Sequence, residues 1–160
     1  MSTIHDAGKG YFHTIWGSGG LCERYPYMYP KPAYAALATL TRVLDGAEFA
    51  RVVPTGSHSL YALEFKRADG LVYALEFKRA DGPVYALWTA RGTRSVRVLL
   101  GGEAGAVVTD LYGAEVSMQG AELSLEVGEG ACYVRPGARL EKILAAESRF
   151  PDEPPPEQYQ

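Results

Sequence analysis

The sequence predicts a mainly β protein, an antiparallel β-sandwich with one N-terminal helix. Three observations carry this prediction. Apolar and polar residues alternate with a period of two after Gly46, as in strands with one buried and one wetter face. Turn residues separate the strand-like runs at spacings of about 8 to 12 residues, which is typical of sandwiches and barrels. The eighteen glycines and ten prolines also favour a chain with many turns.

Length and composition indicate one ordinary globular domain. A chain of 160 residues buries roughly 70% of the surface that its unfolded form exposes, so it can build a core without disulfide or metal staples. The net charge is -3, and Lys and Arg are scattered, so nucleic acid is not expected as a partner. No apolar run approaches the roughly 20 residues that span a bilayer, and residues 1–20 lack the features of a signal peptide. No membrane partner is expected, and the compartment stays open.

Residues 1–30 are expected to form a strand followed by a connector. Tyr11–Trp16 has the composition of a strand, and the glycine-rich stretch at 17–20 ends it. Residues 24–30 read RYPYMYP, and each proline forces extended geometry on the residue before it.

Residues 31–46 are expected to form the helix, from Lys31 to Asp45. Pro32 stands in the first turn, where proline is tolerated, and Gly46 follows as a natural C-cap. The apolar residues between them recur at helical spacing: Ala33, Leu37, Leu40 and Leu44.

The sandwich is expected to occupy residues 47–138. Its strand-like runs are Glu48–Val53, Leu60–Lys66, Val72–Lys78, Val84–Ala90, Ser95–Leu100, Ala106–Leu111, Ala114–Met118, Ala121–Val127 and Ala131–Val134. Within residues 139–160, Arg139–Glu147 predicts a short amphipathic helix. Phe150–Gln160 is polar and rich in proline, which predicts a disordered tail.

One strand-and-turn unit is duplicated within the sandwich. Tyr61–Gly70 is repeated letter for letter as Tyr73–Gly82, and Val84–Leu87 begins a third, diverging copy. A repeat architecture would recur over the whole domain and drift, so this perfect local repeat favours a recent or engineered insertion. One extra strand would reverse every later strand of a meander. One copy must therefore be looped out, added at a sheet edge or swapped with another chain.

Identical copies can occupy the same strand position with the same contacts, so the register is degenerate. The second copy leads directly into Val84–Ala90, and we therefore predict that it keeps the native hairpin with that strand. Looping out twelve residues costs about 2 kcal/mol by the logarithmic closure term. The displaced copy would expose an unpaired strand edge that can pair with another chain, which predicts a homodimer as a secondary outcome.

The chemistry-bearing residues do not form a complete catalytic set. The three histidines, at positions 5, 13 and 58, have no metal-ligand spacing, and no G-x-S-x-G elbow is present. Cys22 and Cys132 form no CxxC motif, so free or buried thiols are favoured over a disulfide. We expect no catalytic residue, no metal and no cofactor.

Three acidic residues are candidates for glycoside hydrolysis, which needs two carboxyl groups facing one bond. Glu64 and Glu76 occupy the same position of the duplicated unit and are flanked by Lys and Arg, so we expect them on solvated strand faces. Glu23 lies beside the aromatic connector, but exposure or a salt bridge near Arg24 is the favoured interpretation.

Four aromatic residues form the candidate ligand-binding set. They are Trp16, Tyr25, Tyr27 and Tyr29. Aromatic rings combine apolar area with a polar edge and can stack on sugar rings. Tyrosines that alternate with proline can equally lock a connector onto a neighbouring domain, and this packing role is favoured.

Two phrases of the sequence carry a resemblance to a known family. The stretch from Tyr11 to Gly46, with YFHTIWGSGG and KPAYAALATLTRVLDG, resembles the last strand and helix of the catalytic (β/α)8 barrel of clan A glycoside hydrolases. The phrases VYALWTARG, VTDLYGAEV and CYVRPG resemble the C-terminal β-sandwich domain of those enzymes. The likeness covers about residues 11 to 137, and the duplicated unit departs from the single YALEFKRADGPVYALW of the family pattern.

The resemblance implies an accessory domain without catalysis of its own. The barrel strands that carry the acid/base and nucleophile carboxylates do not match any part of this chain, whereas Trp16 matches an aromatic that closes the sugar subsite. The leading hypothesis is a non-catalytic accessory β-sandwich of glycoside hydrolase origin with a structural role, whose partner is the catalytic barrel. The alternatives are a carbohydrate-binding module, or a glycoside hydrolase whose catalytic part is missing from this chain.

Overall fold

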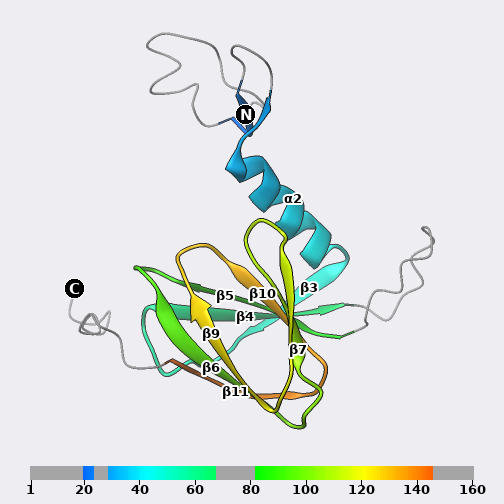
Figure 1. Ribbon diagram of the computed structural model, residues 1–160, viewed down its shortest axis with the longest axis vertical. Helices are drawn as coiled ribbons and strands as arrows, with labels where there is room; N and C mark the ends of the chain where they lie inside the picture. The colour runs from blue at the N-terminus through cyan, green and yellow to red at the C-terminus, as the bar shows by residue number, and fades with distance from the viewer. Residues whose placement is uncertain (1–19, 24–28, 68–81, 146–160) are drawn as a thin grey trace. The chain divides into compact units, whose positions relative to one another are not determined.

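A computed structural model describes residues 20–23, 29–67 and 82–145 of the chain. Within these residues the protein is mainly β, with two antiparallel sandwich sheets and one helix, as predicted (Figure 1). A short two-stranded sheet, β1 with β2, was not predicted, because residues 24–30 were expected to form a connector. The chain divides into two compact units. The first comprises residues 1–42 with 111–113, and the second comprises residues 43–110 with 114–160.

The first unit contains a small hairpin and most of the helix. Strands β1 (Cys22–Glu23) and β2 (Tyr29–Pro30) pair antiparallel. Helix α2 (Pro32–Leu44) begins at the predicted proline and ends two residues before Gly46, whose φ of 66° is a left-handed conformation suited to glycine. The helix prediction is confirmed to within one residue at each end.

The second unit is the sandwich. Its six-stranded sheet has the order β3 (Ala47–Val52), β4 (Leu60–Arg67), β5 (Val84–Thr89), β10 (Cys132–Pro136), β7 (Ala106–Thr109) and β8 (Glu115–Met118). Its three-stranded sheet has the order β11 (Leu140–Ala145), β6 (Arg94–Leu100) and β9 (Glu122–Val127). All pairings between neighbouring strands are antiparallel.

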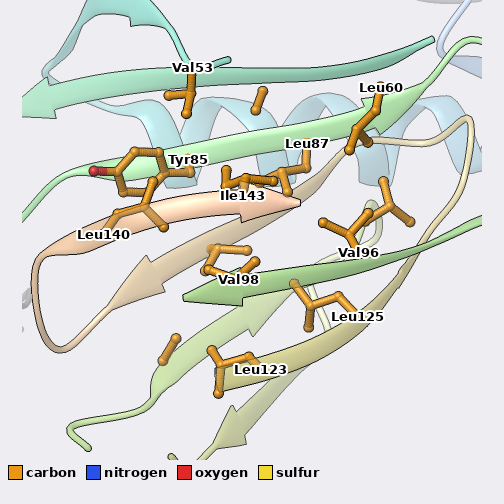
Figure 2. Close-up of a cluster of buried hydrophobic side chains, with 14 of the residues drawn as sticks. Val53, Leu60, Tyr85, Leu87, Val96, Val98, Leu123, Leu125, Leu140 and Ile143 are labelled. Carbon is orange, nitrogen blue, oxygen red and sulfur yellow. The ribbon is translucent and has the colours of Figure 1, made fainter. Parts of the chain in front are cut away.

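The main core lies between these two sheets. In β9 the apolar residues at 123, 125 and 127 are buried, whereas the polar residues between them are exposed, which confirms the predicted alternation. Figure 2 shows side chains from both sheets meeting in this cluster, among them Leu87 from β5, Val98 from β6 and Ile143 from β11. Each fully buried side chain of this size contributes about 1.5–3 kcal/mol relative to an exposed one.

The short helix predicted within Arg139–Glu147 is wrong, because Leu140–Ala145 of this segment forms β11 and pairs with β6. The register shifts between Leu140 and Lys142, which marks a bulge. The extra residue lets Leu140 and Ile143, three positions apart, both point into the core. A spacing of three is also the helical signal, so the bulge imitates an amphipathic helix in the sequence.

The prediction that the second copy of the duplicated unit keeps the native hairpin is also wrong. The first copy forms β4 and pairs with β5 from Leu60↔Thr89 to Phe65↔Val84. On its other side β4 pairs with β3, a neighbour that the prediction neglected. Either copy lengthens one of the two connections by twelve residues, and the logarithmic closure term makes the choices equal to within about 1 kcal/mol.

The short connection between β3 and β4 favours the first copy. The Thr55 hydroxyl is buried and donates to the Leu60 carbonyl at 2.9 Å. The Val53 N–H donates to the Ala62 carbonyl at 2.8 Å.

The predicted strands Tyr11–Trp16 and Val72–Lys78 and the predicted tail Phe150–Gln160 lie outside the described residues.

Candidate functional site

Of the four predicted ligand-binding aromatics, only Tyr29 lies within the described residues. It stands in β2 opposite Glu23 of β1, and it is 50% exposed. Trp16, Tyr25 and Tyr27 lie outside the described residues. The exposure of Tyr29 leaves one face available for contact, whether with a sugar or with a protein surface.

Helix α2 exposes a continuous apolar surface, which we call the helix stripe. It consists of Tyr34, Leu37 and Leu40, which are 46%, 43% and 42% exposed. Residues three apart on a helix are offset by about 60°, so the three side chains cover roughly a third of its circumference. The residues that the sequence places at helical spacing are Ala33, Leu37, Leu40 and Leu44, but of these only Leu44 packs against a core cluster. Large exposed apolar surfaces mark interaction sites.

The helix stripe lies on a helix that has very few polar side chains. Its sequence is PAYAALATLTRVL, and the first charged residue is Arg42, in the last turn. Thr41 turns its hydroxyl onto its own helix and donates to the carbonyls of Leu37 and Ala38 at 2.9 and 3.0 Å. Thr39 is buried. A helix that is apolar all round is typical of a buried position and unusual for one that faces water.

The turn at Leu111–Gly113 contacts the helix. Arg42 Nη2 donates to the Gly113 carbonyl at 3.3 Å. Gly113 has a φ of 94°, and a Cβ there would lie 3.0 Å from Thr39 Oγ1, so this approach requires glycine. The turn that ends the VTDLYG phrase therefore contacts the C-terminal half of the helix that KPAY begins.

The outer side of β3, β4 and β5 carries two aromatic pairs, which we call the aromatic sheet face. Tyr61 and Trp88 stack with ring centroids 5.2 Å apart and planes at 14°. Phe49 and Phe65 meet edge to face at 6.0 Å. Cross-strand aromatic pairs of this kind stabilise a sheet. Because Tyr61 and Trp88 turn one face towards each other, only the other face of each ring remains for a sugar. The sequence alone does not point to these residues, because the strand pairing has to be known before the rings can be matched.

Glu64 is buried, so the prediction that it lies on a solvated strand face is wrong. It is 5% exposed and sits on the same side of β4 as Leu60 and Ala62, which point into the core. Arg51 Nε lies 2.6 Å from its Oε2 and compensates the buried charge. One paired carboxylate does not supply the two carboxyl groups that glycoside hydrolysis requires.

Other reactive groups of the described residues do not assemble into a site. Cys22 and Cys132 are free, and burial raises the pKa of the Cys132 thiol to about 11. A thiol with so high a pKa is a poor nucleophile at neutral pH. In the described part of the chain, no group of three or more His, Cys, Asp or Glu residues could hold a metal ion.

The buried phenol of Tyr85 makes the free energy of unfolding depend on pH in the alkaline range. Burial raises its pKa above the ordinary 10.0, and the Glu64 carboxylate adds to this, against an opposing effect of Arg51 and Arg139. The folded protein then holds the phenol proton more tightly than the unfolded chain does. This contribution is complete below about pH 10 and is lost as the pH rises through the folded-state pKa.

We therefore expect the free energy of unfolding, measured by urea titration, to fall above about pH 10. Tyr85→Phe removes the titrating phenol, so its stability should fall less steeply over the same range. The remaining slope would come from Tyr133 and Cys132, whose pKa values burial also raises. The Cys132 contribution is lost from about pH 9, because the ordinary pKa of its thiol is 9.0 and the folded-state pKa is about 11. Parallel curves for the wild type and Tyr85→Phe would contradict this expectation.

Comparison with known proteins adds no relative to these observations. No protein-family model matches the chain. No curated protein and no solved structure matches it either. Among the described residues, no helix is both long and apolar enough to cross a bilayer.

Proposed function

We propose that this chain is a non-catalytic accessory β-sandwich related to glycoside hydrolases, with a structural role. Its helix α2 docks onto a (β/α)8 barrel catalytic domain. The observation that carries this proposal is the helix stripe on a helix whose first ten residues, Pro32–Thr41, include no charged side chain. Such a surface is expected to be covered by a partner.

The energetics favour a protein partner of substantial area. Full burial of a Tyr- or Leu-sized side chain contributes about 1.5–3 kcal/mol relative to full exposure. The three stripe residues are each a little under half exposed, so covering them contributes about 2–4 kcal/mol before other contacts are counted. This free energy is enough to dock the helix, but tight binding needs further contacts. The exposed Tyr29 can supply one of them.

The resemblance to clan A glycoside hydrolases supplies the identity of the proposed partner. In that pattern the KPAY helix follows the last barrel strand, so the helix belongs to the barrel's outer ring. A helix in such a ring packs one side on barrel strands and other sides on neighbouring helices. This environment suits a helix that is apolar over most of its surface.

Binding to a barrel domain tests the proposal. The probe is a clan A glycoside hydrolase barrel whose own last helix and sandwich have been deleted, titrated with this chain by calorimetry. We expect micromolar binding, at least tenfold weaker for Leu37→Asp combined with Leu40→Asp, because two charges would have to be desolvated. Val116→Asp is the control, since Val116 is an apolar residue on β8 that is more exposed than either leucine. Absence of wild-type binding, or equal loss in the control, would refute the proposal.

A carbohydrate-binding module is the second candidate, and the exposed rings of Tyr29 and Tyr61 favour it. Titration with a panel of oligosaccharides distinguishes the two functions. Sugar binding that is lost when Tyr61→Ala is combined with Tyr73→Ala, the same position of the second copy, and kept in Leu37→Asp would support the module. Binding of the barrel with no response to sugars would support the structural role.

A further inference from the structure

The aromatic and charged contacts that β4 makes with β3 and β5 come from inside the duplicated unit. Tyr61 stacks on Trp88 of β5, and Phe65 meets Phe49 of β3. Glu64 pairs with Arg51, and Ala62 is completely buried in the core. The second copy offers the same four side chains at the same spacing, as Tyr73, Ala74, Glu76 and Phe77.

We propose that either copy can fill the β4 position, so that residues 72–79 can replace residues 60–67 between β3 and β5 of the same chain. The occupant is fixed by identity of sequence, because β3 and β5 would meet the same side chains in the same register. The position thus has two interchangeable occupants, whereas register is normally fixed by a unique hydrophobic pattern.

The exchange leaves the rest of the sandwich unchanged. Both copies run from the β3 side of the chain to the β5 side, so either one lies antiparallel to β3 and to β5. With the first copy in place, the long connection follows β4, and with the second copy it precedes β4. No later strand reverses direction in either arrangement, which resolves the topological conflict of an extra strand.

The two arrangements differ in stability because a different residue precedes each copy of the unit. Leu60 begins β4 and is buried, whereas Val72 stands at the corresponding place before the second copy. Valine buries one methylene less, which lowers the population of the second arrangement about fourfold. The Thr55 bond to the Leu60 carbonyl is made to the backbone, so its loss depends on the connection and not on the side chain.

Aspartate substitutions in the two copies test the exchange. Ala62→Asp places a charge in the core, and a unique β4 would lose its fold. We expect Ala62→Asp to melt within about 10 °C of the wild type, because the second copy takes over. Ala74→Asp should melt within about 3 °C. The double variant should lose its cooperative transition. Ala106→Asp is the matched control, since Ala106 is buried in the same core but has no duplicate.

The indole N–H of Trp88 reports the occupant in solution by nuclear magnetic resonance. The wild type should show two signals, of which Ala62→Asp keeps the weaker and Ala74→Asp the stronger. Unfolding of Ala62→Asp to the same extent as Ala106→Asp would overturn the proposal. So would a folded Ala62→Asp that occurs only as a dimer in light scattering, because the strand would then come from another chain.

Discussion

Tyr133→Ala is expected to lower the free energy of unfolding by about 3–5 kcal/mol, the usual range for removing a large buried aromatic ring. Tyr133 is the second residue of β10 and is 1% exposed. It belongs to the smaller of the two core clusters, with Val43, Val84 and Ala86. A cluster of four buried residues has few neighbours that can move into the cavity, so relaxation would recover little of the loss.

The same substitution should loosen the end of α2. Val43 is the last residue but one of the helix, and its buried contacts are those of this cluster. Urea unfolding followed by circular dichroism measures the stability, and the melting temperature should fall by about 10 °C or more. Tyr133→Phe keeps the ring and should lose no more than about 1 kcal/mol. A loss below about 1 kcal/mol for Tyr133→Ala would show that the cluster contributes little.

The helix and the strands in which apolar residues recur at one constant spacing were predictable from the sequence. Helix α2 has a proline at its first turn and a glycine beyond its last, and both boundaries follow from backbone chemistry. Strand β9 alternates strictly between apolar and polar residues, so its two faces were assigned correctly. In these segments the local pattern and the tertiary environment agree.

The errors arose where a neighbour in space decides the outcome. The bulge in β11 gave a strand the spacing of a helix. Glu64 was expected in solvent because its flanking residues are charged, but the pleat turns it inward and Arg51 of β3 compensates it. The choice between the two copies depended on both partners of β4, and one partner was neglected.

The candidate site was less predictable than the fold. The spacing of Leu37 and Leu40 indicates an apolar helix face, yet spacing does not tell whether that face meets the same domain or a partner. The structure shows these side chains exposed, and this exposure carries the functional proposal. The predicted aromatic set contributes only Tyr29 to the described residues.

Gly105→Ala is expected to lower the free energy of unfolding by about 3 kcal/mol, through two additive effects. The first is conformational, because Gly105 has a φ of 67° and a side chain in this region costs about 1–2 kcal/mol. The second is steric, because a Cβ at this position would collide with the Met118 carbonyl oxygen and lie 3.0 Å from Gln119 Cα. Forcing an extra methyl into a packed site costs about 1–3 kcal/mol.

The backbone around Gly105 has little freedom to relieve this collision. The Gly105 carbonyl accepts a hydrogen bond from the Gly137 N–H at 2.9 Å, which ties it to the end of β10. Met118 is the last residue of β8 and pairs with Ala106 of β7. A shift at Gly105 would therefore disturb two strand ends at once.

Gly46→Ala is the control that separates the two effects. Gly46 has nearly the same φ, 66°, but no atom lies within 4 Å of its hypothetical Cβ. It should lose only the conformational part, about 1 kcal/mol. Urea titration of both variants under one condition gives the comparison. Equal losses in the two variants would mean that the backbone near Gly105 shifts easily to accommodate the methyl group. A loss about 2 kcal/mol larger for Gly105→Ala would show that the backbone contact between Gly105 and Met118 is rigid.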